Sequence, residues 1–302
     1  MQRNESELIM RIGWIGTGVM GRSMAGHLLA AGHDLHIHSR TKEKAAELIA
    51  RGAVWHDRAA DAARDATVVF MMLGFPADVR AVALGPCGVI ASLPPDGVLV
   101  DCTTSSPALA VELADAARAR GCFALDAPVS GGDVGARNAT LSIMVGGDAT
   151  AFERVRPLFE TLGKTIVHHG APGTGQHTKM VNQILIAAGM VAVCEGLLYA
   201  RTCGLDLDKV MASVGGGAAG SWSLANYGPR ILKGDFAPGF YVEHFVKDMQ
   251  IALDEADRMG LILPGLALAK TLYDKLMEMG GARNGTQSLI RALEALAPSG
   301  NT

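Results

Sequence analysis

Three glycines near the start of the chain have the spacing of a nucleotide-binding turn. They lie between the apolar run Met10–Ile15 and the apolar-periodic stretch Ser23–Ala31, in the segment Gly16-Thr17-Gly18-Val19-Met20-Gly21. In a turn from strand to helix, the first glycine permits the tight bend, the second lets backbone approach a pyrophosphate, and the third lets helix and strand pack closely. The free N–H groups of the helix then face the anion. These six residues are therefore predicted to bind a dinucleotide.

The end of the next predicted strand, Leu35–His38, bears on which dinucleotide binds. A site for NAD usually carries a carboxylate about 20 residues after the glycines, where it binds the ribose hydroxyls. Here the strand is followed by Ser39, Arg40 and Thr41. A guanidinium can bind a 2′-phosphate through paired hydrogen bonds, and the hydroxyls can donate further ones. We therefore expect NADP, with NAD as the alternative if Arg40 only begins a solvated helix capped by Thr41.

A second group of polar residues lies where a long helix is predicted to begin, at about Gln176. This start puts Lys179 in the first turn, with Asn182 on the same face. The helix dipole disfavours a cation there by ~0.3–1 kcal/mol at exposed sites, and burial in a cleft adds to the effect. Both influences favour loss of the proton, which suits general acid–base chemistry near neutral pH. A solvated lysine is the plainer alternative.

A third segment combines a hydroxyl with glycines after a predicted strand. It contains Ser130, Gly131 and Gly132. Successive backbone N–H groups in such a turn can form a concave anion site, which would suit the carboxylate of a small substrate. An ordinary glycine-rich turn is the alternative interpretation.

The elements that must position these residues alternate between short apolar runs and helical patterns. Strands are predicted at 68–73, 98–102, 123–127 and 141–145, and this alternation is typical of a parallel sheet. Ligands of such sheets bind beyond the carboxyl ends of the strands. Leu73, Thr103, Thr104 and Ser130 should therefore line one crevice together with the glycine turn.

The pattern changes after residue 174, because only helical periodicity follows. Helices are predicted at 176–201, 207–214, 221–232, 246–259, 266–279 and 288–296. We expect an α/β dinucleotide-binding domain with a doubly wound parallel sheet over 1–174, and an all-α substrate and dimerisation domain over 175–302. The long helix that begins the second domain has little polar face in its middle, so it should contact both domains and could contact another subunit.

Composition narrows the range of functions. The chain has 302 residues, of which 49% are hydrophobic and 19% charged. Its net charge is −3, and it contains no run of Lys and Arg that would bind nucleic acid. Its five cysteines are scattered, which favours neither a disulfide framework nor a structural zinc site, and no metal is expected. We find no signal peptide and no apolar run long enough for a bilayer. The sequence predicts a cytoplasmic protein without a membrane or nucleic-acid partner.

Four motifs in order resemble those of the β-hydroxyacid dehydrogenases, a family that includes 3-hydroxyisobutyrate dehydrogenases, tartronate semialdehyde reductases and glyoxylate/succinic semialdehyde reductases. The motifs are the glycine turn, Asp126–Gly132, Gly173–Asn182, and Phe240 with Lys247 and Asp248. The resemblance extends from residue 10 to about 295, and the longer 6-phosphogluconate dehydrogenases are related. It implies a Rossmann-like first domain and a homodimer or homotetramer.

The resemblance also implies an activity and a division of roles. An NAD(P)-dependent oxidoreductase of class EC 1.1.1.- would transfer hydride between NADP(H) and a short 3-hydroxy acid or semialdehyde acid. Lys179 would exchange the proton, Asn182 would orient the reacting oxygen, and Ser130–Gly132 would hold the substrate carboxylate. Thr104 and Lys247 would contact the cofactor, and Asp248 would lie beside Lys247. Phe240 would contribute to the substrate pocket, for which Trp222 and Tyr241 are further candidates.

Two positions depart from the family pattern. The family's Asp-x-Ser-Thr reads Asp101-Cys-Thr103-Thr104 here, and Gln183 replaces a second asparagine, so no catalytic role is assigned to it. Two alternatives stay open: a non-catalytic NADP-binding interaction module, and a glyoxylate or succinic semialdehyde reductase in place of a 3-hydroxyisobutyrate-type enzyme. A short-chain dehydrogenase is disfavoured, because none of the four tyrosines is followed four residues later by lysine.

Overall fold

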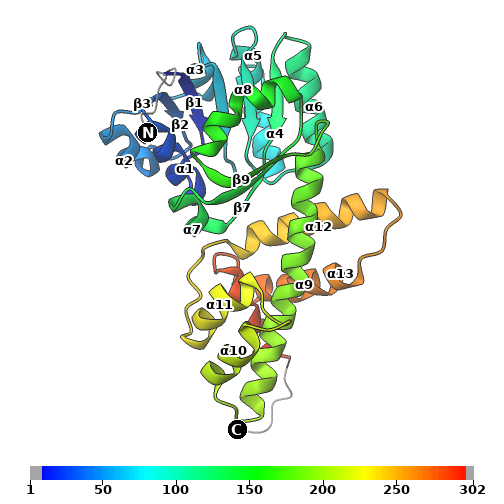
Figure 1. Cartoon of the computed structure of the whole chain (residues 1–302). Coiled ribbons are helices and arrows are strands. Elements are labelled where there is room, and N and C mark those ends of the chain that lie inside the picture. The colour runs from blue at the N-terminus through cyan, green and yellow to red at the C-terminus, as the bar shows by residue number, and fades with distance from the viewer. Residues whose placement is uncertain (1–8, 297–302) are drawn as a thin grey trace. The chain divides into compact units, whose positions relative to one another are not determined.

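The computed structural model of the chain describes residues 9–296. Its contacts separate into two compact units, one running through Lys179 and the other beginning at Met180 (Figure 1). The long helix α9 (Thr174–Thr202) begins in the first unit and continues into the second.

The first unit is built around a six-stranded parallel sheet in the order β3-β2-β1-β4-β5-β6. The chain starts in the middle of this sheet, builds outward to β3 on one side, and returns to build β4 to β6 on the other, so that ligands are expected beyond the strand ends near β1 and β4. The strands are β1 (Arg11–Ile15), β2 (Asp34–His38), β3 (Val54–Trp55), β4 (Val68–Met71), β5 (Val98–Asp101) and β6 (Phe123–Asp126). The intervening helices are α1 (Val19–Ala30), η1 (Lys42–Ala45), α2 (Ala46–Ala50), α3 (Ala59–Ala63), α4 (Pro76–Leu84), α5 (Val89–Ser92) and α6 (Pro107–Arg118).

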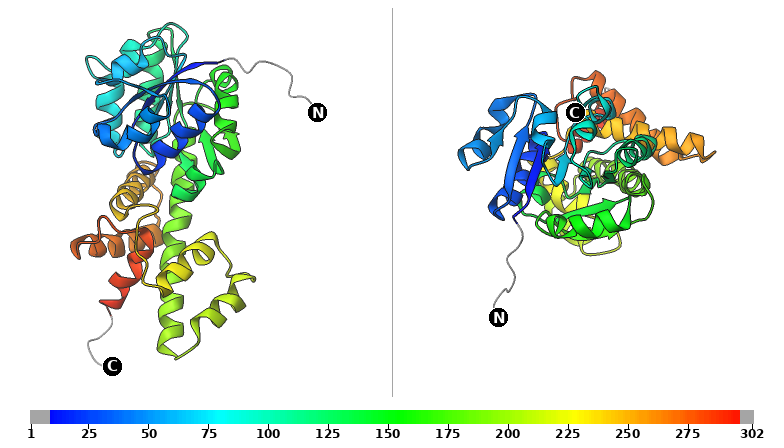
Figure 2. Two further views of the ribbon diagram at one scale, coloured as in Figure 1. Left: turned by 90° about the vertical axis from the view of Figure 1, so that its left-hand side faces the viewer. Right: turned by 90° about the horizontal axis from the view of Figure 1, so that it is seen from above.

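The strands are apolar on both sides because helices cover both faces of the sheet (Figure 2). Successive side chains of a strand point to opposite faces, so neighbours enter different cores. Trp14 and Phe70 stack at 5.4 Å in the core that faces α1 and α8 (Ala149–Glu160). Ile15 and Met71, the next residues, are buried in the core beneath α4 and α6. This two-layered burial confirms the predicted doubly wound α/β fold.

A second, three-stranded sheet was not predicted. It consists of β7 (Val129–Ser130), β8 (Leu141–Val145) and β9 (Gly163–His168), with β8 antiparallel to β7 and parallel to β9, and with α7 (Gly132–Arg137) between β7 and β8. The expectation that 141–145 joins the main parallel sheet is wrong. After β8, Gly146 bridges Asp126 in antiparallel orientation, which links the end of β8 to the end of β6 without extending the parallel order.

From residue 180 to 296 the structure contains helices and no strand, as predicted. After α9 the helices are α10 (Leu207–Gly215), α11 (Trp222–Leu232), α12 (Val242–Arg258), α13 (Pro264–Glu278), η2 (Thr286–Ser288) and α14 (Leu289–Glu294). Their core centres on Tyr273, which is fully buried, contacts Phe245 edge-on at 5.1 Å and donates a 2.8 Å hydrogen bond to the carbonyl oxygen of Thr286.

Among the described residues, α9 alone is long and apolar enough to cross a membrane by length and composition. Only 39% of its most apolar window is buried within the structure. One face, including Ala187, Met190 and Cys194, belongs to the core of the helical unit. A core helix meets the same criterion as a membrane span, so this property gives little support to a membrane location.

Candidate active site

The glycine turn has the local geometry that the motif predicts. Gly16 has a φ of +100°, and a Cβ atom there would lie 2.3 Å from the carbonyl oxygen of Met72. A Cβ atom on Gly21, in the first turn of α1, would lie 2.1 Å from the carbonyl oxygen of Gly16. Both positions therefore require glycine for the fold itself. A Cβ atom on Gly18 would have no other atom within 4 Å, so this position leaves open space at the start of the helix.

This turn fits the phosphate groups of a dinucleotide. Gly18 caps α1 without a side-chain hydrogen bond, so the first N–H groups of the helix have no side-chain acceptor there. Thr17 is buried, and its hydroxyl oxygen has no hydrogen-bond partner within the structure. Backbone N–H groups at a helix N-terminus and a buried hydroxyl are the donors that bind a phosphate. The residues present therefore suit the group that the motif implies.

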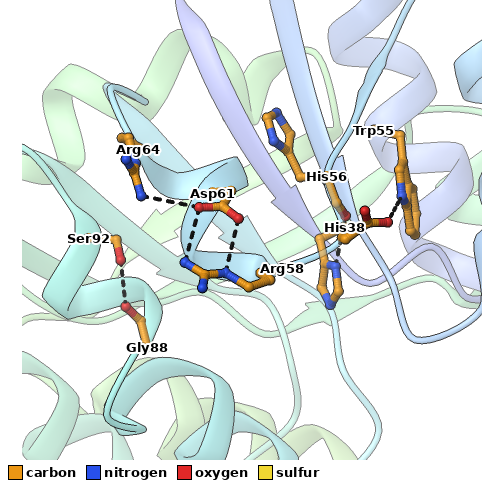
Figure 3. Close-up of polar contacts among 9 residues, drawn as sticks. His38, Trp55, His56, Arg58, Asp61, Arg64, Gly88 and Ser92 are labelled. Atoms are coloured by element: carbon orange, nitrogen blue, oxygen red, sulfur yellow. Dashed lines mark hydrogen bonds and ion pairs between the residues drawn. The ribbon is translucent and has the colours of Figure 1, made fainter.

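The end of β2 lacks a carboxylate. His38 ends the strand, and its Nδ1 atom lies 3.0 Å from the carbonyl oxygen of His56 (Figure 3). The nearby Asp57 accepts a 2.8 Å hydrogen bond from Trp55. Ser39 is linked to the glycine turn, because its hydroxyl accepts a 3.4 Å hydrogen bond from the N–H of Thr17. The residues that follow β2 are thus hydroxyl-bearing or cationic, at Ser39, Arg40 and Thr41.

Arg40 projects into solvent beyond β2. Its side chain is 83% exposed and forms an ion pair with Asp78 of α4, with a distance of 3.3 Å between Nη1 and Oδ1. Thr41 follows as the N-cap residue of η1, as in the alternative interpretation, but its side chain makes no capping hydrogen bond.

The loops after β4 and β5 meet the glycine turn. The N–H of Leu73 donates a 2.9 Å hydrogen bond to the hydroxyl of Thr103, whose own N–H binds Asp101 at 3.0 Å. The side chain of Leu73 lies 3.1 Å from the position of a Cβ on Gly16. These residues therefore share the carboxyl edge of the sheet, as expected, and Thr104 follows them in a half-buried position.

A buried carboxylate joins the end of β6 to the start of α9. Asp126 accepts 2.8 Å hydrogen bonds from the N–H groups of Gly173 and Gln176, one on each oxygen. Burial raises the pKa of Asp126 to about 6, although these N–H donors oppose the shift. No role was predicted for Asp126 by itself, since an aspartate at a strand end does not reveal which helix start it contacts.

Gln176 fixes the same helix to the loop after β5. Its side chain is fully buried, donates to the carbonyl oxygen of Thr103 at 2.7 Å, and accepts from the N–H of Ser105 at 3.0 Å. This contact was also missed, because nothing in the local sequence indicates which loop the amide meets. Together, Asp126 and Gln176 hold the first turn of α9 against the sheet.

Lys179 is only 6% exposed, and its Nζ donates a 2.8 Å hydrogen bond to the carbonyl oxygen of Val129. The lysine thus contacts the residue that precedes Ser130 and the two glycines in the chain, and the glycines have φ angles of +131° at Gly131 and +62° at Gly132. Because α9 begins at Thr174, Lys179 is in the second turn and not the first. The helix dipole acts mainly within the first turn, so it bears less on this ammonium than the sequence predicted.

In the helical unit, a chain of polar side chains connects α9 to α12. The Nδ2 of Asn182 donates to the Oε1 of Gln183 at 2.6 Å, and the Nε2 of Gln183 donates to the Oδ2 of Asp248, also at 2.6 Å. Lys247 forms an ion pair with the other oxygen of Asp248 at 2.9 Å. The structure therefore joins three predicted residues through Gln183, to which the sequence assigned no role.

The three aromatic candidates have different surroundings. Phe240 is half-buried with its ring centre 5.6 Å from that of Phe245, and Tyr241 lies under the guanidinium of Arg283 at 4.4 Å. Trp222 is 53% exposed and meets Tyr227 edge-on within α11. Across residues 9–296 no group of three or more His, Cys, Asp or Glu side chains could hold a metal ion.

Comparison with known families covers both units. Residues 11–170 match the family described as the NAD binding domain of 6-phosphogluconate dehydrogenase, and residues 173–293 match the NAD-binding domain of NADP-dependent 3-hydroxyisobutyrate dehydrogenase. The chain is 53% identical over 287 residues to the probable 3-hydroxyisobutyrate dehydrogenase-like protein 1, mitochondrial, of Arabidopsis thaliana, covering 95% of this chain and 86% of the relative. It is 39% identical to the 2-hydroxy-3-oxopropionate reductase of Escherichia coli, covering 95% and 98%.

Two solved structures have the same fold over nearly the whole chain. The 3-hydroxyisobutyrate dehydrogenase of Mycobacterium tuberculosis with L-serine is 30% identical, with a TM-score of 0.85 over 95% of this chain and 99% of that one. Psf3 in complex with NADP+ and 2-OPP is 29% identical, with a TM-score of 0.86 over 93% and 99%.

The fold, the glycine turn and these matches define a nicotinamide-dependent oxidoreductase. More narrowly, the chain belongs to the β-hydroxyacid dehydrogenase family, whose members are NAD(P)-dependent 3-hydroxyacid dehydrogenases.

Proposed function

We propose that this enzyme interconverts a short 3-hydroxy acid and the corresponding semialdehyde acid with NADP(H), and that Lys179 exchanges the proton of the reacting oxygen. The observation that carries this proposal is the buried Lys179 ammonium, 2.8 Å from the carbonyl oxygen of Val129 and so adjacent to Ser130 in the chain. If the turn of Ser130 and the two glycines holds the carboxylate of the substrate, this buried amine can exchange a proton with the reacting oxygen of the same substrate.

The chain's residues would divide the work as follows. Ser130, Gly131 and Gly132 bind the substrate carboxylate, which orients the substrate. Lys179 donates a proton to the carbonyl oxygen in reduction and accepts it in oxidation. Asn182, three residues later on α9 and therefore on the same side of the helix, hydrogen-bonds to that oxygen. When bound, the nicotinamide supplies or accepts the hydride. Fixed orientation and stabilisation of developing negative charge together account for much of the rate in such sites.

The substrate is proposed to be a small acid of the kind that the relatives' names indicate. The matched relatives are named for 3-hydroxyisobutyrate and for 2-hydroxy-3-oxopropionate, and one matched structure contains L-serine. All three compounds are short carboxylic acids with an oxygen on the third carbon. Phe240 and Asp248 would belong to the substrate side of the site, and glyoxylate or succinic semialdehyde would compete as alternative substrates.

NADP is the proposed cofactor. The glycine turn, Ser39, Arg40 and Thr41 would bind the adenosine half, while Leu73, Thr104 and Lys247 would contact the remainder. Support comes from the cationic and hydroxyl groups after β2, from a family description that specifies NADP, and from a matched structure that holds NADP+.

The enzyme is further proposed to be a homodimer or homotetramer. Along α9 the exposed residues between 181 and 199 recur about every three to four positions, and Glu195 is the one charged residue among them: Val181, Leu185, Ala188, Ala192, Glu195, Gly196 and Tyr199. Leu185 and Tyr199 are 70% and 72% exposed. A helix face this apolar and this long is the kind of surface that a second subunit covers. In this arrangement residues 1–174 would bind the cofactor and 175–302 would bind substrate and form the dimer.

All five cysteines are free, which agrees with the proposed cytoplasmic location.

The decisive experiment measures NADPH and NADH oxidation with glyoxylate and with succinic, tartronate and methylmalonate semialdehydes, for the wild type and for Lys179→Ala. We expect Lys179→Ala to lower kcat by about 10²- to 10⁴-fold, the usual contribution of a general acid or base. Lys270→Ala serves as the control, because Lys270 is a partly buried lysine paired with Asp274 elsewhere in the helical unit.

Two outcomes would overturn parts of the proposal. Full activity of Lys179→Ala would show that another group exchanges the proton. A wild type that binds NADPH but reduces no semialdehyde of the panel would favour an NADP-binding module over a semialdehyde reductase.

A further inference from the structure

Gln183 is buried between Asn182 and a charged pair, and both the oxygen and the nitrogen of its side-chain amide form hydrogen bonds. It is 1% exposed on α9, accepts a 2.6 Å hydrogen bond from Asn182, and donates one of equal length to Asp248. A glutamine amide can donate only through nitrogen and accept only through oxygen. The two contacts therefore admit a single orientation of the Gln183 amide.

Asp248 sets this orientation from α12. Its side chain is 1% exposed, one oxygen accepts from Gln183, and the other is 2.9 Å from the ammonium of Lys247. An ionised carboxylate accepts hydrogen bonds and donates none, so the Nε2 of Gln183 must face Asp248 and its Oε1 must face Asn182. That oxygen in turn requires the Nδ2 of Asn182. The charge on α12 thus decides which way the Asn182 amide turns.

We propose that Gln183 is a positioning residue for the reaction. It acts through Asn182, because the Oε1 of Gln183 holds the Nδ2 of Asn182 toward itself. The orientation of the Gln183 amide is in turn fixed by Asp248, which is paired with Lys247. The nitrogen of Asn182 carries a second N–H, which is the donor that a reacting oxygen requires. This inference rests on the proposed function, in which Asn182 contacts that oxygen.

The length of the side chain matters as well as its polarity. Asparagine at this position, which is one methylene shorter, cannot span two contacts that are each already 2.6 Å long. Gln183→Asn is therefore expected to lose one of the two bonds. Gln183→Met keeps the approximate length and volume but loses both.

The first test compares kcat and KM for the wild type, Gln183→Met and Gln183→Asn. We expect kcat to fall about tenfold in Gln183→Met and by less in Gln183→Asn, with KM for NADPH within twofold of the wild type, because a charge-anchored hydrogen bond is lost without loss of a cofactor contact. Gln287→Met is the matched control: Gln287 is also fully buried in the helical unit, but donates only to backbone oxygens of Asp235 and Ala237. It should lower the urea midpoint and leave kcat within twofold.

A double-mutant cycle tests whether Gln183 acts through Asn182. In an Asn182→Ala background, Gln183→Met should lower kcat by less than a further twofold. A tenfold fall in both backgrounds would overturn the proposal. The urea midpoints of the same four proteins give a readout independent of turnover: non-additive shifts are expected from the contact, and additive shifts would contradict it even if no substrate were turned over.

The pH profile of Gln183→Glu gives a signature that a merely structural role would not produce. A protonated carboxyl can donate to Asp248 and accept from Asn182, as glutamine does, whereas an ionised carboxyl cannot donate. The variant should therefore be most active at low pH and lose activity as pH rises, relative to the wild type. The titratable groups that bear on it are its partner Asp248, Lys247 and His244 beside Asp248 on α12, and Lys179 one turn earlier on α9, and all are present in the wild-type control. A variant profile parallel to that of the wild type would contradict the proposal.

Discussion

At the scale of single residues, the proposed NADP preference depends on a guanidinium held only weakly in the free enzyme. The pair between Arg40 and Asp78 has a distance of 3.3 Å, and its arginine side chain is 83% exposed. Solvent and salt screen such pairs, which contribute about 0–1 kcal/mol. A doubly charged phosphate would therefore displace Asp78 at little cost and gain paired, charge-assisted hydrogen bonds.

We expect Arg40→Asp to shift the preference from NADPH toward NADH. Charge-assisted hydrogen bonds contribute about 1.5–3 kcal/mol each, so kcat/KM for NADPH should fall about 10- to 100-fold, while that for NADH changes little. Steady-state kinetics with both cofactors measure the shift. Arg64→Asp is the control, because it makes the same charge change at a 65% exposed arginine that also pairs with an aspartate, Asp61 (Figure 3). Arg64 precedes the amino end of β4, whereas Arg40 follows the carboxyl end of β2. An unchanged cofactor ratio in Arg40→Asp would assign the preference to other residues.

At the scale of elements, the start of α9 is held by a carboxyl that titrates near neutral pH. Burial raises the pKa of Asp126 from 3.8 to about 6. The folded protein therefore binds this proton more tightly than the unfolded chain does, and the group contributes most to stability when it is protonated. That contribution is complete below about pH 3.8 and is lost as pH rises through about 6.

The difference in unfolding free energy between the wild type and Asp126→Asn should therefore increase as pH falls from 7.5 to 4. A shift of about two pKa units corresponds to roughly 3 kcal/mol. Urea unfolding of both proteins at each pH measures this difference, and using the difference cancels the titration of the other carboxyls. A constant offset is also expected, since an amide nitrogen would face the N–H of Gly173 or Gln176. A pH-independent difference would mean that Asp126 does not titrate in this range.

At the scale of the whole molecule, the exposed apolar face of α9 predicts self-association. Light scattering of the wild type should give two or four times the chain mass of 31.5 kDa. Leu185→Glu, which replaces a 70% exposed apolar side chain of this face with a charge, should shift the mass toward that of the single chain. Leu268→Glu on α13 is the control, because Leu268 is similarly apolar and 55% exposed but lies off that face. A wild-type mass of 31.5 kDa would contradict the proposed oligomer.

Much of the architecture was predictable because burial leaves a pattern in the sequence. Strands covered on both faces are continuously apolar, as in Val68–Met71, and the helices of the second unit show a period near 3.6 residues. The second sheet left no such pattern. Its first strand has two residues and its last, Gly163–His168, is largely exposed, so neither forms an apolar run.

By itself the sequence determined the positions at which the backbone or local chemistry requires one residue type. Gly16 and Gly21 are examples, because a Cβ atom there would collide with the neighbouring backbone. Only the tertiary structure decided which polar groups meet. The bonds of Asp126 to Gly173 and of Gln183 to Asp248 join residues 47 and 65 positions apart. A hydrogen bond depends on distance and direction in space, and the local sequence of one partner contains no information about the position of the other.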